Sequence, residues 1–176
     1  MRYAQIRQMD ISNGEGIGVS LFVQGCHFHC KNCFNSETWD FDGGKEWTDE
    51  TTNRFLELIQ KTYVKRISIL GGEPLAEENV SSVFELVNTT HLLFPEKIIW
   101  LYTGYTWEDL YPKVTSDCLA QTEIARQLIV EQCDVVVDGR FKEELKDIAL
   151  PWRGSSNQRV INVKQTLQQG KIVLWK

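Results

Sequence analysis

The sequence predicts an α/β fold with a mostly parallel sheet. Short β-branched, apolar stretches alternate with amphipathic helical stretches along most of the chain. This alternation is typical of parallel strands that are joined by right-handed crossovers. The 176 residues suit one domain, 1–176, and can bury a sizeable core. They fall short of the roughly 250 residues of a closed eight-fold β/α barrel, so a closed barrel is excluded.

Local patterns justify the elements in chain order. Residues 17–25 form an apolar, β-branched run that predicts a buried strand. Thr48 is expected to cap a helix that runs to about residue 62, because acidic residues fill its first turn. A helix over about 76–91 carries valines at i, i+3 and i+7. The other expected elements are strands at 66–70, 97–103 and 134–137, a helix from about Asp117 to Glu131, and a C-terminal hairpin of 159–163 and 171–175 around Gln168–Gly170.

Charge and composition narrow the class of function. The 24 Asp and Glu outnumber the 19 Lys and Arg, and this acidity argues against a nucleic-acid partner, which usually meets a basic stripe. No apolar run approaches the ~18 residues of a membrane span, and the first ten residues do not resemble a signal peptide. We therefore expect no membrane partner, a cytoplasmic location and reduced thiols.

Each expected parallel strand is followed by a polar or glycine-bearing loop. A cysteine-rich loop follows the first strand, and Gly71-Gly72-Glu73-Pro74 follows the second. Thr103-Gly104 and Asp138-Gly139-Arg140 follow the next two. Because the C-terminal ends of parallel strands meet at one edge of a sheet, we expect a single active site there, with the cysteines at one end.

Three of the five cysteines, Cys26, Cys30 and Cys33, lie within eight residues. This spacing is a poor disulfide framework, and soft thiolates select zinc or an iron–sulfur cluster. A structural zinc ion would need a fourth ligand, which His27 or His29 could supply. A 4Fe–4S cluster on three cysteines would leave one iron open to a small molecule. Chemistry alone favours the cluster, with zinc or a redox role as the alternatives.

The other two cysteines, the two histidines and one C-terminal stretch are given structural predictions with a functional alternative. Cys118 and Cys133 read as small packing residues, with a redox pair between them as the alternative. His27 and His29 alternate with the cysteines, so we expect them to point away from a bound metal centre. The stretch WRGSSNQR (152–159) is expected either to contact a partner or substrate, or to close the sheet as a structured loop.

The motifs resemble those of the radical S-adenosylmethionine superfamily. Its pattern is Cys-x3-Cys-x2-Cys after a first strand, an aromatic residue after the last cysteine (here Phe34), and Gly-Gly-Glu after the second strand. Within it, the chain resembles the activating proteins of anaerobic ribonucleoside-triphosphate reductase, which implies an incomplete TIM-like β/α barrel. The stretches that carry this resemblance are DISNGEG (10–16), FVQGCHFHCKNCFNSETW (22–39), ISILGGEPL (67–75), WLYTGY (100–105), DVVVDGRF (134–141) and WRGSSNQR (152–159).

The resemblance implies one 4Fe–4S cluster on Cys26, Cys30 and Cys33, the three catalytic and metal-binding residues. S-adenosylmethionine would chelate the open iron. Its reductive cleavage would give a 5′-deoxyadenosyl radical, which would generate a glycyl radical near the C-terminus of the reductase. The implied partners are therefore that reductase and a one-electron donor such as a flavodoxin.

The resemblance also implies contacts to S-adenosylmethionine beyond the cysteines. Gly71 and Gly72 would let the backbone approach its methionine part, and Glu73 would accept from its ammonium group. For Phe34 the alternative is core packing, for Thr103 a turn, and for Asp138 and Arg140 a surface ion pair or a contact with the incoming peptide. The cofactor-binding residues implied in this way are Asn32, Cys33, Phe34, Gly71, Gly72, Glu73, Thr103, Asp138 and Arg140.

Two other classes of function remain open at the level of the sequence. One is another small enzyme of the same superfamily, similar to 7-carboxy-7-deazaguanine synthase or to pyruvate formate-lyase activase. The other is a module that binds zinc or an iron–sulfur cluster without catalysis.

Overall fold

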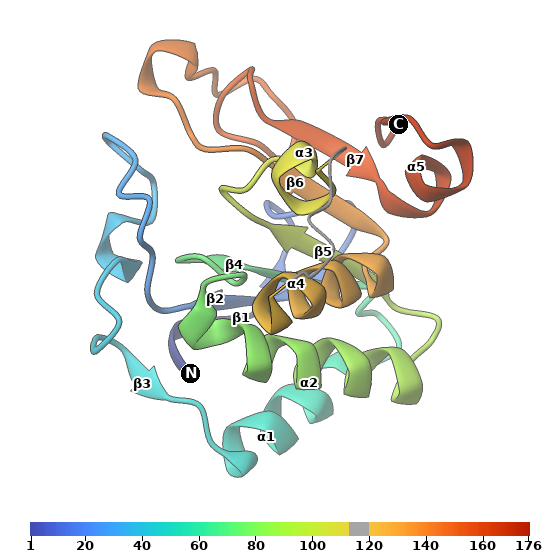
Figure 1. The fold of residues 1–176 in the computed structure, drawn as a ribbon. Helices are drawn as coiled ribbons and strands as arrows, with labels where there is room; N and C mark the ends of the chain where they lie inside the picture. The colour runs from blue at the N-terminus through green and yellow to red at the C-terminus, as the bar shows by residue number, and fades with distance from the viewer. Residues whose placement is uncertain (113–119) are drawn as a thin grey trace.

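The computed structural model describes residues 1–112 and 120–176 (Figure 1). Among these residues, seven strands form one mixed sheet in the order β3-β1-β2-β4-β5-β6-β7. The four middle strands run parallel, and antiparallel strands flank them on both sides. The strands are β1 (Arg2–Asp10), β2 (Gly18–Val23), β3 (Lys45–Glu46), β4 (Arg66–Gly71), β5 (Ile98–Tyr102), β6 (Val135–Asp138) and β7 (Arg159–Asn162).

The helices fall where the sequence patterns place them, with two additions. Thr48 caps the first long helix as predicted, because its hydroxyl accepts a hydrogen bond from the backbone N–H of Thr51. The predicted cap at Asp117 lies outside the described residues. The helices are α1 (Asp49–Ile59), α2 (Glu77–Leu93), α3 (Trp107–Leu110), α4 (Gln121–Gln132) and α5 (Val163–Gln169), with 3₁₀ turns at Ser36–Thr38 and Glu143–Leu145.

The α/β class and the parallel middle of the sheet are confirmed, whereas the predicted C-terminal hairpin is confirmed only in the antiparallel approach of its two arms. Residues 163–169 form helix α5 in place of a tight turn. The Asn162 side chain accepts from the N–H of Gln165 and starts this helix, and Gly170 ends it in the left-handed conformation. Strand β7 pairs antiparallel with β6 on one side. On its other side an antiparallel bridge joins Ile161 to Leu174, and two backbone hydrogen bonds of 2.8 Å flank it, from the N–H of Asn162 to Val173 and from the N–H of Trp175 to Val160.

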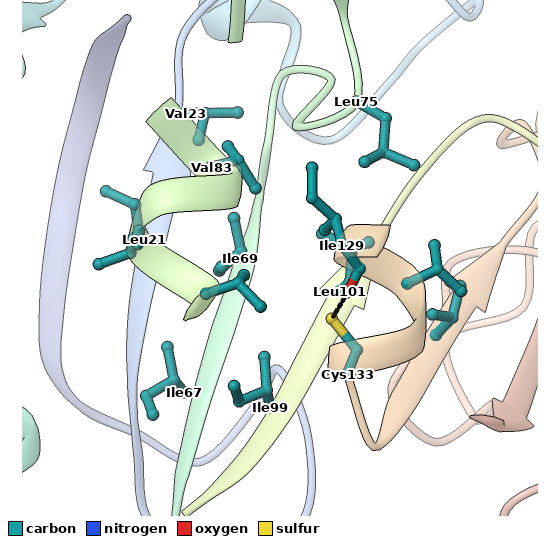
Figure 2. Packing of buried hydrophobic residues seen from close by; sticks show 14 of the residues in the cluster. Leu21, Val23, Ile67, Ile69, Leu75, Val83, Ile99, Leu101, Ile129 and Cys133 are labelled. Atoms are coloured by element: carbon teal, nitrogen blue, oxygen red, sulfur yellow. Dashed lines mark hydrogen bonds between the residues drawn. The ribbon is translucent and has the colours of Figure 1, made fainter. Parts of the chain in front are cut away.

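Helices α1, α2 and α4 gather on one side of the sheet (Figure 1) and bury its aliphatic face. Figure 2 shows side chains of the parallel strands packed against α2 and α4. Cys133 is fully buried among them and donates its S–H to the carbonyl oxygen of Ile129, at 3.2 Å. Burial also raises the pKa of this thiol. The predicted packing role of Cys133 is therefore confirmed, while Cys118 lies outside the described residues.

The opposite face of the same strands carries polar and charged side chains as well as apolar ones. Alternate residues of β2, β4 and β5 point there, and among them Ser20, Arg66, Ser68 and Tyr102 are polar or charged. Tyr102, together with Phe22 and Leu70 of the same face, lines the cavity described below. No helix within the described residues is long and apolar enough to cross a membrane.

Candidate active site

A cavity of about 540 Å³ lies over the polar face of the sheet. All four loops that follow the parallel strands contribute to its wall, as the sequence predicts for one edge of a parallel sheet. The residues from these loops that line it include Cys26, Phe28, Cys30, Cys33, Phe34, Asn35, Gly72, Glu73, Thr103, Gly104, Gly139, Arg140 and Phe141.

The three clustered cysteines are free thiols, and all of them line this cavity. Backbone N–H groups act on these thiols: those of Phe28 and His29 oppose the rise that burial causes in the pKa of Cys26. The N–H of Asn35 donates to the sulfur of Cys33 at 3.5 Å. Donors of this kind stabilise thiolates, which are the form of cysteine that binds metal.

Burial raises the pKa of the Cys26 and Cys30 thiols, and the hydrogen bonds from nearby N–H groups only partly oppose this effect. A bound metal centre reverses the balance, because coordination deprotonates a thiol outright. The cavity is therefore suited to cysteines that hold a metal centre, and it leaves them as poor free nucleophiles at neutral pH.

The two histidines of this loop are directed elsewhere, as the sequence predicts. The Nε2 atom of His27 lies 2.9 Å from a carboxylate oxygen of Glu78, and its ring packs on Phe41. The ring of His29 stacks on Trp39 with a centroid distance of 4.7 Å. Neither imidazole is placed as the fourth ligand of a zinc site.

The spacing of the donor groups gives a second argument about the metal. Among the described residues, no group of three or more His, Cys, Asp and Glu side chains converges closely enough to hold a single metal ion. A zinc ion draws its sulfur ligands together, with Zn–S distances of about 2.3 Å. A 4Fe–4S cluster binds each cysteine to a different iron, so it accepts a wider spacing. Three thiols without a fourth ligand from His27 or His29 are compatible with a 4Fe–4S cluster that leaves one iron open.

The Gly-Gly-Glu loop is docked against the cysteine loop. The N–H of Gly72 donates to the carbonyl of Val23, and the N–H of Glu73 donates to that of Gly25, at 2.9 and 2.7 Å. A Cβ atom on Gly72 would lie 2.3 Å from the Gly25 carbonyl oxygen. The absence of a side chain at Gly72 is therefore required for the contact between the two loops, a reason that the sequence alone does not reveal.

The carboxylate of Glu73 is buried and accepts three hydrogen bonds. The donors are the N–H of Leu75, the hydroxyl of Thr103 and the N–H of Gly104, at 2.7 to 2.9 Å. Burial raises the pKa of Glu73 to about 7, against the lowering effect of these donors. Glu73 and Thr103 thus connect the loops after β4 and β5 at the cavity wall.

Two of the residues that the resemblance implies do not line the cavity. Asp138 is buried below its wall, where its carboxylate pairs with Arg159 and accepts from the N–H of Trp107 at 2.8 Å. Asn32 is exposed on the cysteine loop, and its amide donates to Glu143. Arg140 does line the cavity, with its guanidinium 4.3 Å from the centre of the Phe28 ring.

Sequence reasoning singled out Phe34 but missed the other aromatic side chains of the cavity wall. Phe28 lies against Gly104, where a Cβ atom would come within 2.3 Å of its ring. Phe34 is 55% exposed and meets Phe141 edge to face, at 5.2 Å between centroids. Trp152, within the 152–159 stretch singled out in the sequence, also lines the cavity. The signal was present as aromatic residues beside glycine-bearing loops, but only the fold brings them together.

Comparison with known proteins gives consistent results. Residues 12–161 match a family model described as a 4Fe-4S single cluster domain. The chain is 38% identical over 160 residues to an anaerobic ribonucleoside-triphosphate reductase-activating protein of Vibrio cholerae, which covers 90% of this chain and 96% of that protein. Proteins with the same name from Salmonella typhimurium and Enterobacteria phage T4 are 38% and 36% identical, over 93% and 91% of this chain and 100% and 93% of their own lengths.

Proposed function

We propose a specific reaction for this chain, which belongs to the family of anaerobic ribonucleoside-triphosphate reductase-activating proteins. It activates the reductase as a radical S-adenosylmethionine enzyme that generates a glycyl radical. The observation that carries the proposal is the placement of three free thiols in one cavity, directly against a docked Gly-Gly-Glu loop. In this proposal the four parallel strands are the incomplete TIM-like barrel of the superfamily.

Cys26, Cys30 and Cys33 hold the cluster in this assignment. The N–H groups around Cys26 and Cys33 orient the sulfurs and stabilise their charge. When bound, the reduced cluster and S-adenosylmethionine supply a 5′-deoxyadenosyl radical that removes a hydrogen atom from a glycine of the reductase. The protein contributes binding, orientation and the exclusion of side reactions.

The cofactor occupies the end of the cavity beside the cysteines. Gly72 and Gly71 provide backbone at its surface, and Glu73 carries a charge of the sign needed to meet an ammonium group. Phe34 offers an exposed ring for the adenine, and the Arg140 guanidinium makes no ion pair among the described residues and can meet a carboxylate. Thr103 acts through its hydrogen bond to Glu73, and Asp138 acts from below the wall.

The electron enters from a one-electron protein donor such as a flavodoxin. The outer side of the cysteine loop supports this assignment, because His27, His29 and Lys31 are all exposed there. A donor bound on this side would approach the cluster without entering the cavity.

The test uses protein reconstituted with iron and sulfide under anaerobic conditions and then reduced. We expect cleavage of S-adenosylmethionine to 5′-deoxyadenosine, and a glycyl radical in the electron paramagnetic resonance spectrum when the reductase is added. Cleavage without a radical on the reductase would contradict the assigned partner. A preparation that holds about four irons, as a 4Fe–4S cluster requires, yet cleaves no S-adenosylmethionine would contradict the reaction itself.

A further inference from the structure

A charged pair is sealed inside the protein at the end of the sheet away from the cysteines. Arg66, on β4, is fully buried, and Asp10, at the end of β1, is 4% exposed. One guanidinium nitrogen of Arg66 donates to both the carboxylate and the backbone carbonyl of Asp10, at 3.2 and 2.8 Å. Another donates to the hydroxyl of Ser68, which in turn donates to the carbonyl of Asn13.

These bonds fasten the segment 10–14 against the polar face of the sheet. The carboxylate of Asp10 also accepts from the N–H groups of Ser12 and Asn13, at 2.7 and 2.9 Å, so it fixes the turn from both sides. Gly14 packs directly on the Arg66 side chain, where a Cβ atom would lie 2.8 Å away. The segment therefore follows the position of the guanidinium closely.

Stability alone does not account for this arrangement. Burying two charges costs about as much free energy as their attraction returns, and apolar replacements of such pairs are often neutral or stabilising. The Nε atom of Arg66 is buried and makes no hydrogen bond to any described residue. The neighbouring hydroxyl of Tyr102 is also buried and makes no hydrogen bond to any described residue. The buried pair of Arg66 and Asp10 is better explained by the segment that it holds in position.

Ser12 and Asn13 form part of the cavity wall. The carbonyl of Asn13 is held by Ser68, which lies opposite Ser20 in the middle of β2, whereas Cys26 follows the end of that strand. A strand rises about 3.3 Å per residue, so the three residues from Ser20 to the end of β2 set the two walls roughly 10 Å apart along the strand. All the residues assigned above to the cluster and to S-adenosylmethionine lie at the cysteine end. The wall formed by Ser12 and Asn13 is therefore available to the second reactant.

We propose that Arg66 is a positioning residue for the protein substrate. This inference rests on the proposed function of the chain. Through Asp10 and Ser68, Arg66 holds the wall at Ser12 and Asn13 in place, and that wall aligns the glycine-bearing segment of the reductase with the cofactor end of the cavity. Arg66 itself touches neither reactant.

The test compares Ser68→Ala and Arg66→Lys with the wild-type protein. Ser68→Ala removes the bridge to Asn13 with little change in volume. Arg66→Lys keeps the charge but loses the fork that binds Asp10 and Ser68 together. Thr90→Val is the matched control, because it deletes a buried hydroxyl of α2 that has no hydrogen-bond partner among the described residues. Each protein is reconstituted and assayed for S-adenosylmethionine cleavage without the reductase, for glycyl radical formation, and for its dissociation constant with the reductase.

We expect both variants to keep their iron and to cleave S-adenosylmethionine within twofold of the wild-type rate. We expect the yield of glycyl radical per cleavage to fall at least tenfold, or the dissociation constant for the reductase to rise by that factor, with no change in Thr90→Val. Equal losses of iron, cleavage and radical formation would mean that the pair is only structural, and normal coupling in both variants would equally overturn the inference. Failure of the wild-type protein to cleave S-adenosylmethionine would instead refute the proposed function.

Discussion

The two faces of the central sheet are built from the same strands but differ in composition and in what they contact. On the helix face, Leu21, Ile69 and Leu101 pack in a continuous aliphatic layer (Figure 2). On the cavity face, the register sets Ser20 opposite Ser68, with charged and aromatic side chains around them. Strands buried on both faces usually read as continuous apolar runs. The buried polar residues Ser20, Arg66 and Ser68 interrupt the apolar runs of β2 and β4 on the cavity face only, whereas the helix face of these strands is aliphatic throughout.

The largest difference between the two faces is expected in iron content, when one cysteine on each face is replaced by alanine. Cys30→Ala removes a thiol from the cavity wall, and Cys133→Ala removes one from the helix face. We expect Cys30→Ala to lose the cluster and all cleavage of S-adenosylmethionine, because in the proposed site Cys30 is one of only three thiolates that hold the cluster. Cys133→Ala should retain the wild-type iron content, since its thiol only packs and bonds to Ile129. Iron and sulfide analysis after anaerobic reconstitution measures both, and full iron in Cys30→Ala would contradict the assignment.

Adjacent residues of one strand offer a second way to separate the faces. Leu101 is fully buried on the helix face, so Leu101→Ala should lower the free energy of unfolding by about 2–5 kcal/mol through the cavity it leaves. Tyr102 points to the other face, and its hydroxyl has no partner among the described residues. Tyr102→Phe should therefore change stability by less than about 1 kcal/mol, because no hydrogen bond is lost. Urea denaturation of metal-free protein measures both values. A larger loss in Tyr102→Phe than in Leu101→Ala would contradict the division of roles.

The local motifs could be predicted from the sequence because neighbouring residues carry them. The three cysteines, the Gly-Gly-Glu loop and the cap at Thr48 each lie within a few residues, and the parallel topology follows from the alternation of elements. The convergence of the cysteines and the Gly-Gly-Glu loop on one cavity is confirmed. The roles assigned to these residues toward S-adenosylmethionine remain predictions.

The contacts that depend on distant partners could not be predicted. Asp10 and Arg66 are separated by 56 positions, and Asp138 meets Arg159 only because β7 pairs antiparallel with β6. The tight turn predicted between the arms of the C-terminal hairpin was wrong for a related reason. Residues after Asn162 can form either a strand or a capped helix, and the packing of Val163 in the core selects the helix. A charged side chain at the end of a buried strand indicates that a partner of opposite charge exists. Its position in the sequence does not identify that partner.

The pH dependence of stability tests the carboxylate that joins the loops at the cavity wall. The pKa of Glu73 is about 7 in the folded protein and near 4.5 when unfolded, so between these values the folded state keeps a proton that the unfolded state has lost. Stability should therefore fall as the pH rises from about 4.5 to about 7, by about 3 kcal/mol at roughly 1.4 kcal/mol per unit. Glu73→Gln should remove this slope, because an amide has no proton to lose.

The control for this experiment is Glu77→Gln, which changes an exposed carboxylate in the first turn of α2. It should keep the wild-type slope. Denaturation of metal-free protein at a series of pH values measures all three proteins. A slope that persists in Glu73→Gln would assign the titration to another group.

The smallest expected effect lies at the start of α1, on the helix face and far in sequence from the cavity loops. Thr48→Ala removes the hydroxyl that accepts from the N–H of Thr51, and the loss of such a cap costs about 1 kcal/mol. Thr48→Ser restores an acceptor and should recover most of that loss. Cleavage of S-adenosylmethionine per folded molecule should be the same in both variants, because α1 contributes no residue to the cavity wall. A loss of cleavage larger than the loss of folded protein would mean that the helix face controls the cavity after all.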